Sequence, residues 1–353
     1  MKVKGFFRQG FLALMGASVL LLQTFTTETA KSEDLDSRVY CSKTYLPVAL
    51  APGGTKQYRI YGELCGQKQL EQKTVHVLVS GITYDRNYWD FPYQKERYSY
   101  VKALTKAGYA TFNIDRIGIG NSYRPRADQV TVQSNAFVLN QVNQGLREGK
   151  INNVKFKHII NVGHSFGSIV VIEQASQYGG VDGVIISGFL HKLTPELQGL
   201  PNFVYPAQSD SRFKDKDLPN GYLTTLPGTR GQLLYNQPNA DTKIINKDEE
   251  LKQTLTTGEA TTFFPAVTSD ISKKIRVPVL LVIGQKDNFF CSDKICSRKN
   301  VAEFERQFYS PQAQLRVYVQ PDAGHSVNLH LNASEWYEVA EKWSDRFVEN
   351  QHN

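Results

Sequence analysis

Short apolar runs alternate with segments of helical periodicity along most of the chain. The first two runs flank the turn residues Pro52-Gly53-Gly54, so they predict an antiparallel hairpin. The predicted strands cover residues 42–50, 56–65, 74–80, 109–115, 156–162, 181–187, 277–283 and 315–319. The predicted helices cover residues 93–107, 129–148, 166–178, 297–309 and 333–349. This alternation predicts an α/β fold with a mainly parallel central sheet, helices on both faces and the hairpin as an antiparallel edge.

One interval lacks the alternation. Residues 189–276 are rich in Pro, Gly, Thr and Asn and contain only short apolar clusters. A structureless loop of that length is improbable inside a compact domain, so we interpret the interval as an inserted lid or cap. The core is then divided into a first part, residues 31–188, and a second part, residues 277–353.

The first thirty residues have the layout of a secretory signal peptide. Basic residues precede an apolar run over residues 11–22, and a polar stretch then ends in small residues at Ala30. An uncleaved membrane anchor is the alternative, but the run is shorter than the roughly 20 residues that span a bilayer. We therefore expect residues 1–30 to be removed from a secreted protein, extracellular or periplasmic, with no stable membrane insertion after cleavage.

The charge distribution argues against a nucleic-acid partner. The formal net charge is +7, and loss of residues 1–30, with three basic residues and one acidic residue, leaves about +5. Basic and acidic residues are interspersed along the chain, and no basic surface with interleaved aromatic residues is indicated. This mild excess of positive charge favours solubility.

Export allows the four cysteines to be read as two disulfides. Cys41 and Cys65 each lie twelve residues from Gly53, so they face each other in a hairpin centred there. Cys291 and Cys296 then form the second, short-loop pair. Free or metal-binding thiols are the alternative, but the spacing lacks a paired Cys-x-x-Cys pattern.

The strongest chemical signal is Gly-x-Ser-x-Gly between a predicted strand and an apolar helix. Gly163 and Gly167 flank Ser165, and small residues are needed there because a tight strand-to-helix turn leaves no room for side chains. The turn exposes the Ser165 hydroxyl at a helix N-terminus, where developing negative charge is stabilised. A plain structural turn is the alternative, since the pattern also occurs by chance.

A serine nucleophile needs a base, and the base needs an acceptor that holds its tautomer. His325 follows the last predicted strand, at the sheet edge where open α/β folds gather ligands, so it is the candidate base. Asp287 follows the preceding strand and is the candidate acid. The weaker candidates for these two roles are His191, His330, Asp293 and Asp322.

The order Ser165, Asp287, His325 resembles that of the α/β-hydrolase superfamily, in its lid-containing form. The similarity spans roughly residues 40–350. The segment Asp115-Arg116-Ile117-Gly118-Ile119-Gly120-Asn121-Ser122 is also similar to the Asp-x-x-Gly-x-Gly-x-Ser turn of that family. It lacks the third glycine of a nucleotide-binding loop, so we interpret it as a packing turn.

The resemblance also implies an oxyanion hole. One donor is expected to be the backbone N–H of Phe166, and the other that of Ile82, in the loop after the third strand. This loop departs from the usual His-Gly opening because it carries Ser80. Nearby aromatic residues either wall the substrate pocket or cover the sheet edge, and they are Tyr84, Tyr88, Trp89 and Phe91.

The sequence thus predicts a secreted serine hydrolase that cleaves carboxylic ester bonds through an acyl-enzyme on Ser165. The expected partner is a small-molecule ester, with neither a metal nor an organic cofactor. A lipase, thioesterase or lactonase uses the same three residues, and a non-catalytic binding protein of the same fold is a further alternative. The sequon at Asn332 matters only in a eukaryotic secretory pathway.

Overall fold

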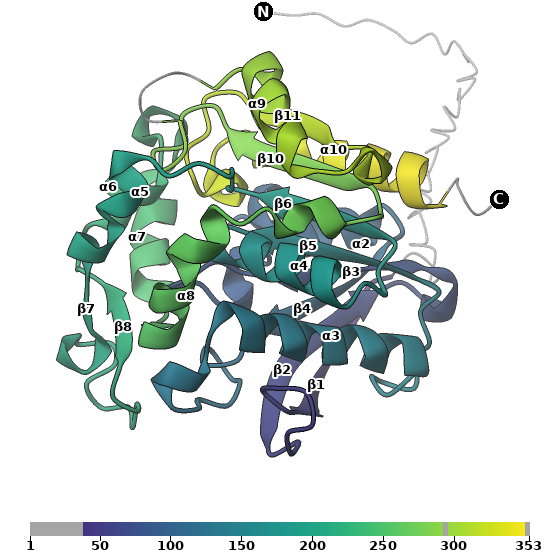
Figure 1. Ribbon diagram of the computed structural model, residues 1–353, viewed down its shortest axis with the longest axis horizontal. Coiled ribbons are helices and arrows are strands. Elements are labelled where there is room, and N and C mark those ends of the chain that lie inside the picture. Colours follow the sequence, from purple (N-terminus) through teal and green to yellow (C-terminus); the bar gives the residue numbers. More distant parts are fainter. Residues whose placement is uncertain (1–37, 292–295, 350–353) are drawn as a thin grey trace, which may run out of the picture. The chain divides into compact units, whose positions relative to one another are not determined.

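The computed structural model describes residues 38–291 and 296–349 (Figure 1). The predicted signal peptide, residues 1–30, therefore lies outside the described residues. Within the described ranges, no helix combines the length and the apolar character needed to cross a membrane.

An eight-stranded sheet carries the fold, in the order β1-β2-β4-β3-β5-β6-β10-β11. Its strands are β1 (Tyr40–Val48), β2 (Tyr58–Gly66), β3 (Thr74–Val79), β4 (Ala110–Asp115), β5 (His158–His164), β6 (Gly183–Ser187), β10 (Val279–Gly284) and β11 (Arg316–Gln320). Neighbouring strands from β4 to β11 are parallel, whereas β1 and β2 pair antiparallel and β2 pairs antiparallel with β4. The predicted mainly parallel sheet with an antiparallel edge is confirmed.

Helices cover both faces of this sheet. On the face nearer the viewer in Figure 1, α3 (Val132–Glu148) packs beside α4 (Phe166–Gln177). Elsewhere in the fold, α2 (Tyr100–Lys106) packs against α10 (Ala333–Ser344), where the Tyr100 and Trp336 rings stack with centroids 4.9 Å apart. Another helix, α9 (Arg298–Glu305), follows β10.

The helix predicted over residues 93–107 is broken. It consists of α1 (Lys95–Tyr98) and α2, with Ser99 in an extended conformation between them. The Ser99 hydroxyl accepts a hydrogen bond from the backbone N–H of Lys102 and donates one to Asp90. A new helix start leaves its first backbone N–H groups unpaired, and the Ser99 hydroxyl accepts one of them, so Ser99 caps α2 and the helix restarts at Tyr100.

The interval from 189 to 276, called the inserted segment below, leaves the sheet after β6 and returns at β10. It contains α5 (Pro195–Gln198), β7 (Val204–Pro206), β8 (Tyr222–Thr225), α6 (Arg230–Leu234), α7 (Thr242–Leu251), β9 (Leu255–Thr256) and α8 (Thr257–Val267). The three strands form a small antiparallel sheet of their own. Its elements lie at the left of Figure 1, at one end of the central sheet. Its role as a lid stays a prediction.

Both predicted disulfides are present. The hairpin register pairs Cys41 with Cys65, and these residues are joined by a disulfide across 24 positions of sequence. Cys291 and Cys296 form the second bridge, across five positions. The first bridge fastens the outermost strand, whose residues are largely exposed, to the rest of the sheet.

Removal of the first bridge is expected to destabilise the fold. The chain-entropy model gives about 3 kcal/mol for a loop of this length, so Cys41→Ala/Cys65→Ala should lower the free energy of unfolding by that amount. Guanidinium unfolding followed by circular dichroism measures it. The matched variant Cys291→Ala/Cys296→Ala opens a much shorter loop and should lose less. Equal stability of the first variant and the wild type would contradict the expectation.

Candidate active site

Ser165 lies at the junction of β5 and α4 with φ 55° and ψ −120°. A serine rarely adopts a positive φ, and such a conformation persists only where the surroundings enforce it. Its backbone N–H donates to the carbonyl of Ser187 on β6 at 2.8 Å, and its own carbonyl accepts from Ser168 at 2.9 Å. These two bonds hold the turn that presents the hydroxyl.

The two glycines beside Ser165 stand where no side chain fits. A Cβ on Gly167 would lie 2.2 Å from the carbonyl oxygen of Val79, at the end of β3. A Cβ on Gly163 would lie 2.5 Å from the Cα of Ser168. Both clashes are with backbone, which has little freedom to move away, so the turn requires glycine at both positions.

Asp287 and His325 lie in the loops that follow β10 and β11. The Nδ1 atom of His325 is 2.9 Å from Oδ2 of Asp287, and both side chains are buried. The other carboxylate oxygen of Asp287 accepts the backbone N–H groups of Phe289 and Phe290, at 2.9 and 3.3 Å. The carboxylate is therefore fixed on both sides, and it orients the imidazole.

Ser165 and His325 line the same small cavity, of about 30 Å³, together with Ile82. The hydrogen bond from His325 then connects Asp287 to this cavity. Of the weaker candidates, Asp322 is exposed and pairs with Lys286 at 2.9 Å on the surface, and Asp293 lies outside the described residues.

His330 stabilises the loop that carries His325 through hydrogen bonds. Its Nε2 accepts the backbone N–H groups of Gly324 and Asn236, at 2.9 and 3.1 Å, and its Nδ1 donates to the Ser326 carbonyl. Burial lowers the pKa of His330 to about 4, so the ring is neutral near pH 7. His191 is buried elsewhere, where its Nδ1 contacts Glu305 at 2.7 Å.

The loop after β3, residues 80–84, lies against Ser165. A Cβ on Gly81 would be 3.0 Å from the Cβ of Ser165. Within residues 38–291 and 296–349, no protein acceptor takes the backbone N–H of Ile82 or of Phe166. The Ser80 hydroxyl, which stands where the family pattern has histidine, donates to the Tyr84 carbonyl at 3.0 Å and closes the loop internally.

The inserted segment is bonded to this loop. Backbone hydrogen bonds run from Gln253 to the Thr83 carbonyl at 2.9 Å and from Thr83 to the Thr254 carbonyl at 3.3 Å. The Arg230 guanidinium donates to the Thr83 hydroxyl and pairs with the buried carboxylate of Asp248, each at 2.8 Å. Thr83 itself has a φ of 59°, so the insertion helps to hold a strained residue beside Ser165.

A second cavity, of about 110 Å³, adjoins the first and is almost entirely apolar. The two share four lining residues, which are Ile82, Leu200, Val204 and Phe263. Most of the other lining residues of the larger cavity also come from the inserted segment, and they are Pro201, Leu223, Leu255, Glu259, Ala260 and Phe264. A flexible apolar chain attached to a group at Ser165 has space here.

The four aromatic residues in and after this loop divide between the two predicted roles. Tyr84 lines the small cavity. Tyr88, Trp89 and Phe91 are buried in the core, and the Tyr88 ring stacks on His164 with centroids 4.2 Å apart. Three of the four therefore pack in the interior, and one borders the site.

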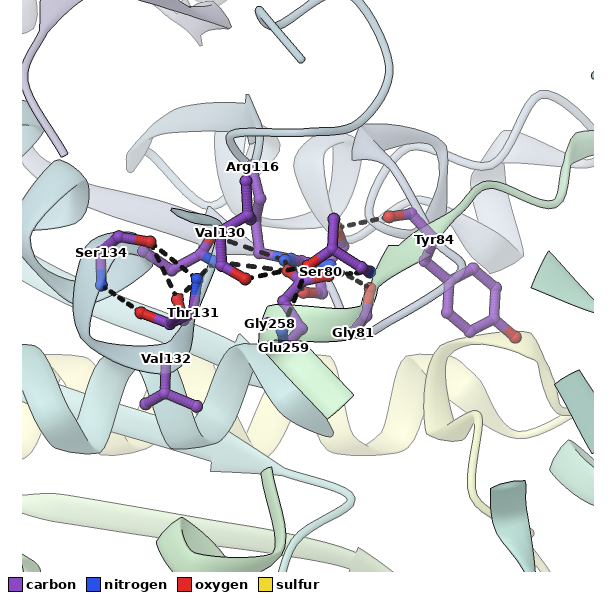
Figure 2. Close-up of polar contacts among 12 residues, drawn as sticks. Ser80, Gly81, Tyr84, Arg116, Val130, Thr131, Val132, Ser134, Gly258 and Glu259 are labelled. Atoms are coloured by element: carbon purple, nitrogen blue, oxygen red, sulfur yellow. Dashed lines mark hydrogen bonds and ion pairs between the residues drawn. The ribbon is translucent and has the colours of Figure 1, made fainter. Parts of the chain in front are cut away.

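Arg116 and Glu259 were not predicted from the sequence as site residues. The Arg116 side chain leaves the turn after β4 and reaches the carbonyls of Ser80 and Gly81, while Glu259 on α8 pairs with it (Figure 2). The two residues are 143 positions apart, so no local pattern indicates the pairing. In the same turn, Gly118 and Gly120 both have positive φ, which glycine adopts without strain.

Comparison with known proteins identifies the family. A model of the alpha/beta hydrolase family matches residues 77–341, so the chain belongs to that family. A search of curated proteins found no match.

Solved structures share the fold. An esterase from Exiguobacterium antarcticum is 17% identical, with a TM-score of 0.57 over 86% of this chain and 99% of its own. A soluble variant of monoglyceride lipase from Saccharomyces cerevisiae is 17% identical, with a TM-score of 0.57 over 86% and 95%. A bromoperoxidase from Bacillus anthracis is 16% identical, with a TM-score of 0.58 over 86% and 100%. At these identities the likeness concerns the fold.

The burial and hydrogen bonds of His330 predict that the stability of the fold depends on pH. Its folded pKa of about 4 is below the ordinary value of 6.5, so the unfolded chain binds the proton first as the pH falls. The contribution of His330 to the free energy of unfolding is complete above pH 6.5. It is lost as the pH falls toward 4, at about 1 kcal/mol per pH unit. Urea unfolding between pH 7 and 4 should therefore show a shallower loss for His330→Gln. If the free energy of unfolding fell with pH equally in this variant and in the wild type, the stabilising role of His330 would be contradicted.

Proposed function

We propose that this protein is a serine hydrolase that cleaves carboxylic esters through an acyl-enzyme on Ser165. The observation that carries the proposal is the Asp287–His325 hydrogen bond beside a cavity that His325 shares with Ser165. This arrangement has the parts that nucleophilic acyl transfer requires: a nucleophile, a base and a group that orients the base.

In the first half of the reaction, Nε2 of His325 accepts the hydroxyl proton while Oγ of Ser165 attacks the ester carbonyl. The carbonyl oxygen becomes an oxyanion, which the N–H groups of Ile82 and Phe166 stabilise. The tetrahedral intermediate then collapses, the bond from carbon to the alcohol oxygen breaks, and His325 returns the proton to the leaving alcohol. The product on the enzyme is an ester of Ser165.

In the second half, water replaces the alcohol. His325 accepts a proton from the water, whose oxygen attacks the acyl carbon. The second intermediate then collapses, the bond from the acyl carbon to Oγ of Ser165 breaks, and His325 returns the proton to Oγ as the acid is released. Asp287 accepts the Nδ1–H of His325 throughout and stabilises the imidazolium that forms twice.

The adjoining apolar cavity supports an ester with one apolar substituent. Ligand sites of this kind are lined mainly by hydrophobic side chains, and the polar groups that fix orientation are few. A lipase or a thioesterase with the same three residues is the second candidate, and the same cavity favours it because both take apolar acyl chains. We assign the inserted segment the role of a cap over the site, because it supplies most of the apolar wall.

The predicted leader and the two disulfides support secretion. Disulfides form and persist in oxidising compartments, and both bridges here are structural. We therefore propose that residues 1–30 direct export and that the mature enzyme acts outside the cytoplasm.

Ser165→Ala tests the nucleophile. Without the hydroxyl no acyl-enzyme forms, so kcat toward p-nitrophenyl esters should fall by at least about 10⁴-fold. A fluorophosphonate probe should label the wild type at Ser165 and leave the variant unlabelled. Ser176→Ala, at the far end of α4, is the matched control and should behave as the wild type. Undiminished hydrolysis by Ser165→Ala would refute the proposed function.

Ala260→Leu tests the apolar cavity. The added carbons occupy space of about 110 Å³ beside the site, so long apolar substituents are excluded and short ones are not. We expect kcat/KM to fall about 10-fold for hexyl substituents with little change for acetyl esters. Series of rising acyl length and of rising alcohol length identify which side of the ester uses the cavity. Thr261→Leu, on the exposed side of α8, is the control. An unchanged length preference in both series would contradict this use of the cavity.

A further inference from the structure

Arg116 joins the turn after β4 to the loop beside Ser165. Its side chain is 1% exposed. Nε donates to the Ser80 carbonyl at 2.8 Å, and Nη2 donates to the Gly81 carbonyl at 3.2 Å (Figure 2). One rigid guanidinium thus binds two consecutive carbonyl groups of the loop, and its planar geometry fixes the direction in which each carbonyl points.

The second of these bonds fixes the direction of a donor. The Gly81 carbonyl and the Ile82 N–H belong to one planar peptide group, in which the C=O and N–H bonds of the trans form point in opposite directions. Because the Gly81 carbonyl oxygen points toward Arg116, the Ile82 N–H of the same peptide group points away from Arg116. Gly81 is in contact with Ser165, and Ile82 lines the cavity that Ser165 shares with His325.

Glu259 fixes the guanidinium from the inserted segment. Its Oε1 pairs with Nη1 of Arg116, and its side chain is also 1% exposed. The same carboxylate accepts the backbone N–H of Thr256 at 2.9 Å, in the capping box that begins α8. Asn135 on α3 contacts both partners, at 3.4 Å to Arg116 and 3.3 Å to Glu259. The charge of Arg116 is therefore paired, and its position is set by three elements.

We propose that Arg116 is a positioning residue for the oxyanion hole, and that Glu259 makes this positioning depend on the inserted segment. The inference rests on the proposed ester hydrolysis. Arg116 acts through the Gly81–Ile82 peptide and does not touch the substrate. A charge-assisted hydrogen bond to the carbonyl also polarises the peptide, which strengthens the Ile82 N–H as a donor.

A purely structural ion pair would have different consequences. Such a pair stabilises or destabilises the fold, and a folded variant without it should keep the rate constant of the wild type. The positioning role instead predicts a lower kcat in a protein that is still folded, with KM little changed, because the oxyanion forms only in the transition state. The value of kcat for the folded fraction of a variant therefore distinguishes the positioning role from a purely structural role.

Two variants keep the fold by different means. Arg116→Lys retains the charge and the pairing with Glu259 but cannot hold both carbonyls with the geometry of the fork. Arg116→Met/Glu259→Leu removes both charges and fills the space with apolar groups, a replacement that buried ion pairs often tolerate. In both variants we expect kcat to fall about 10- to 100-fold, KM to stay within about 3-fold, and the melting temperature to be largely retained.

Glu305→Gln is the control. Glu305 is a buried carboxylate that accepts the backbone N–H of His191 at 2.8 Å and lies 2.7 Å from Nδ1 of the same residue. Within residues 38–291 and 296–349, it makes no hydrogen bond or ion pair with the loop at residues 80–84. Its substitution should change the melting temperature and leave kcat of the folded enzyme unchanged. Circular dichroism and active-site titration of each variant establish the folded fraction.

The outcomes separate the two proposals. An active wild type with wild-type kcat in folded Arg116→Lys would overturn the positioning role and leave the proposed function standing. A loss of kcat that Glu305→Gln reproduces would overturn it as well, since the effect would then follow from any buried charge. A wild type that neither hydrolyses esters nor reacts with a fluorophosphonate would overturn the proposed function, and the positioning role with it.

Discussion

The close approach of backbone segments around Ser165 is the constraint on which the rest of the site depends. The end of β3 lies against α4 so tightly that a Cβ on Gly167 would lie 2.2 Å from the Val79 carbonyl oxygen, and a Cβ on Gly81 would lie 3.0 Å from the Cβ of Ser165. At this junction Ser165 has a positive φ, and it lines the small cavity together with His325. The close approach also brings the loop after β3 within reach of the reacting atoms, so nucleophile and oxyanion donors are positioned by the same packing.

The loops around this point are held mainly by buried polar groups. Asp287 orients His325, His330 secures the loop that carries it, and two ion pairs, Arg116–Glu259 and Arg230–Asp248, reach the loop after β3. Each ion pair has one partner or both in the inserted segment. Buried charges are costly unless they are paired and hydrogen-bonded, and these pairs have both forms of compensation.

Much of the core was predictable from sequence because the signals are local. Apolar runs predict the strands, and the tight turn needs glycine at positions 163 and 167, whose spacing is visible in the sequence. The break at Ser99 was missed because a side-chain cap outweighed helical periodicity. The pairing of Arg116 with Glu259 and the bonds of Thr83 to Gln253 and Thr254 were missed for another reason. They join residues far apart in the sequence, 143 positions in the case of Arg116 and Glu259, and periodicity carries no information on such contacts.

The backbone pairing of Gln253 and Thr254 with Thr83 has a consequence for protein engineering. Exchange of the whole interval 189–276 for that of a relative is an obvious route to new substrate ranges. In this molecule such a graft would remove the anchors of a loop that belongs to the core, so turnover would decline together with the change in selectivity. Chimaeras that retain residues 230–259, and with them Arg230 and Asp248, and that replace only residues 189–229 would keep the two properties separable.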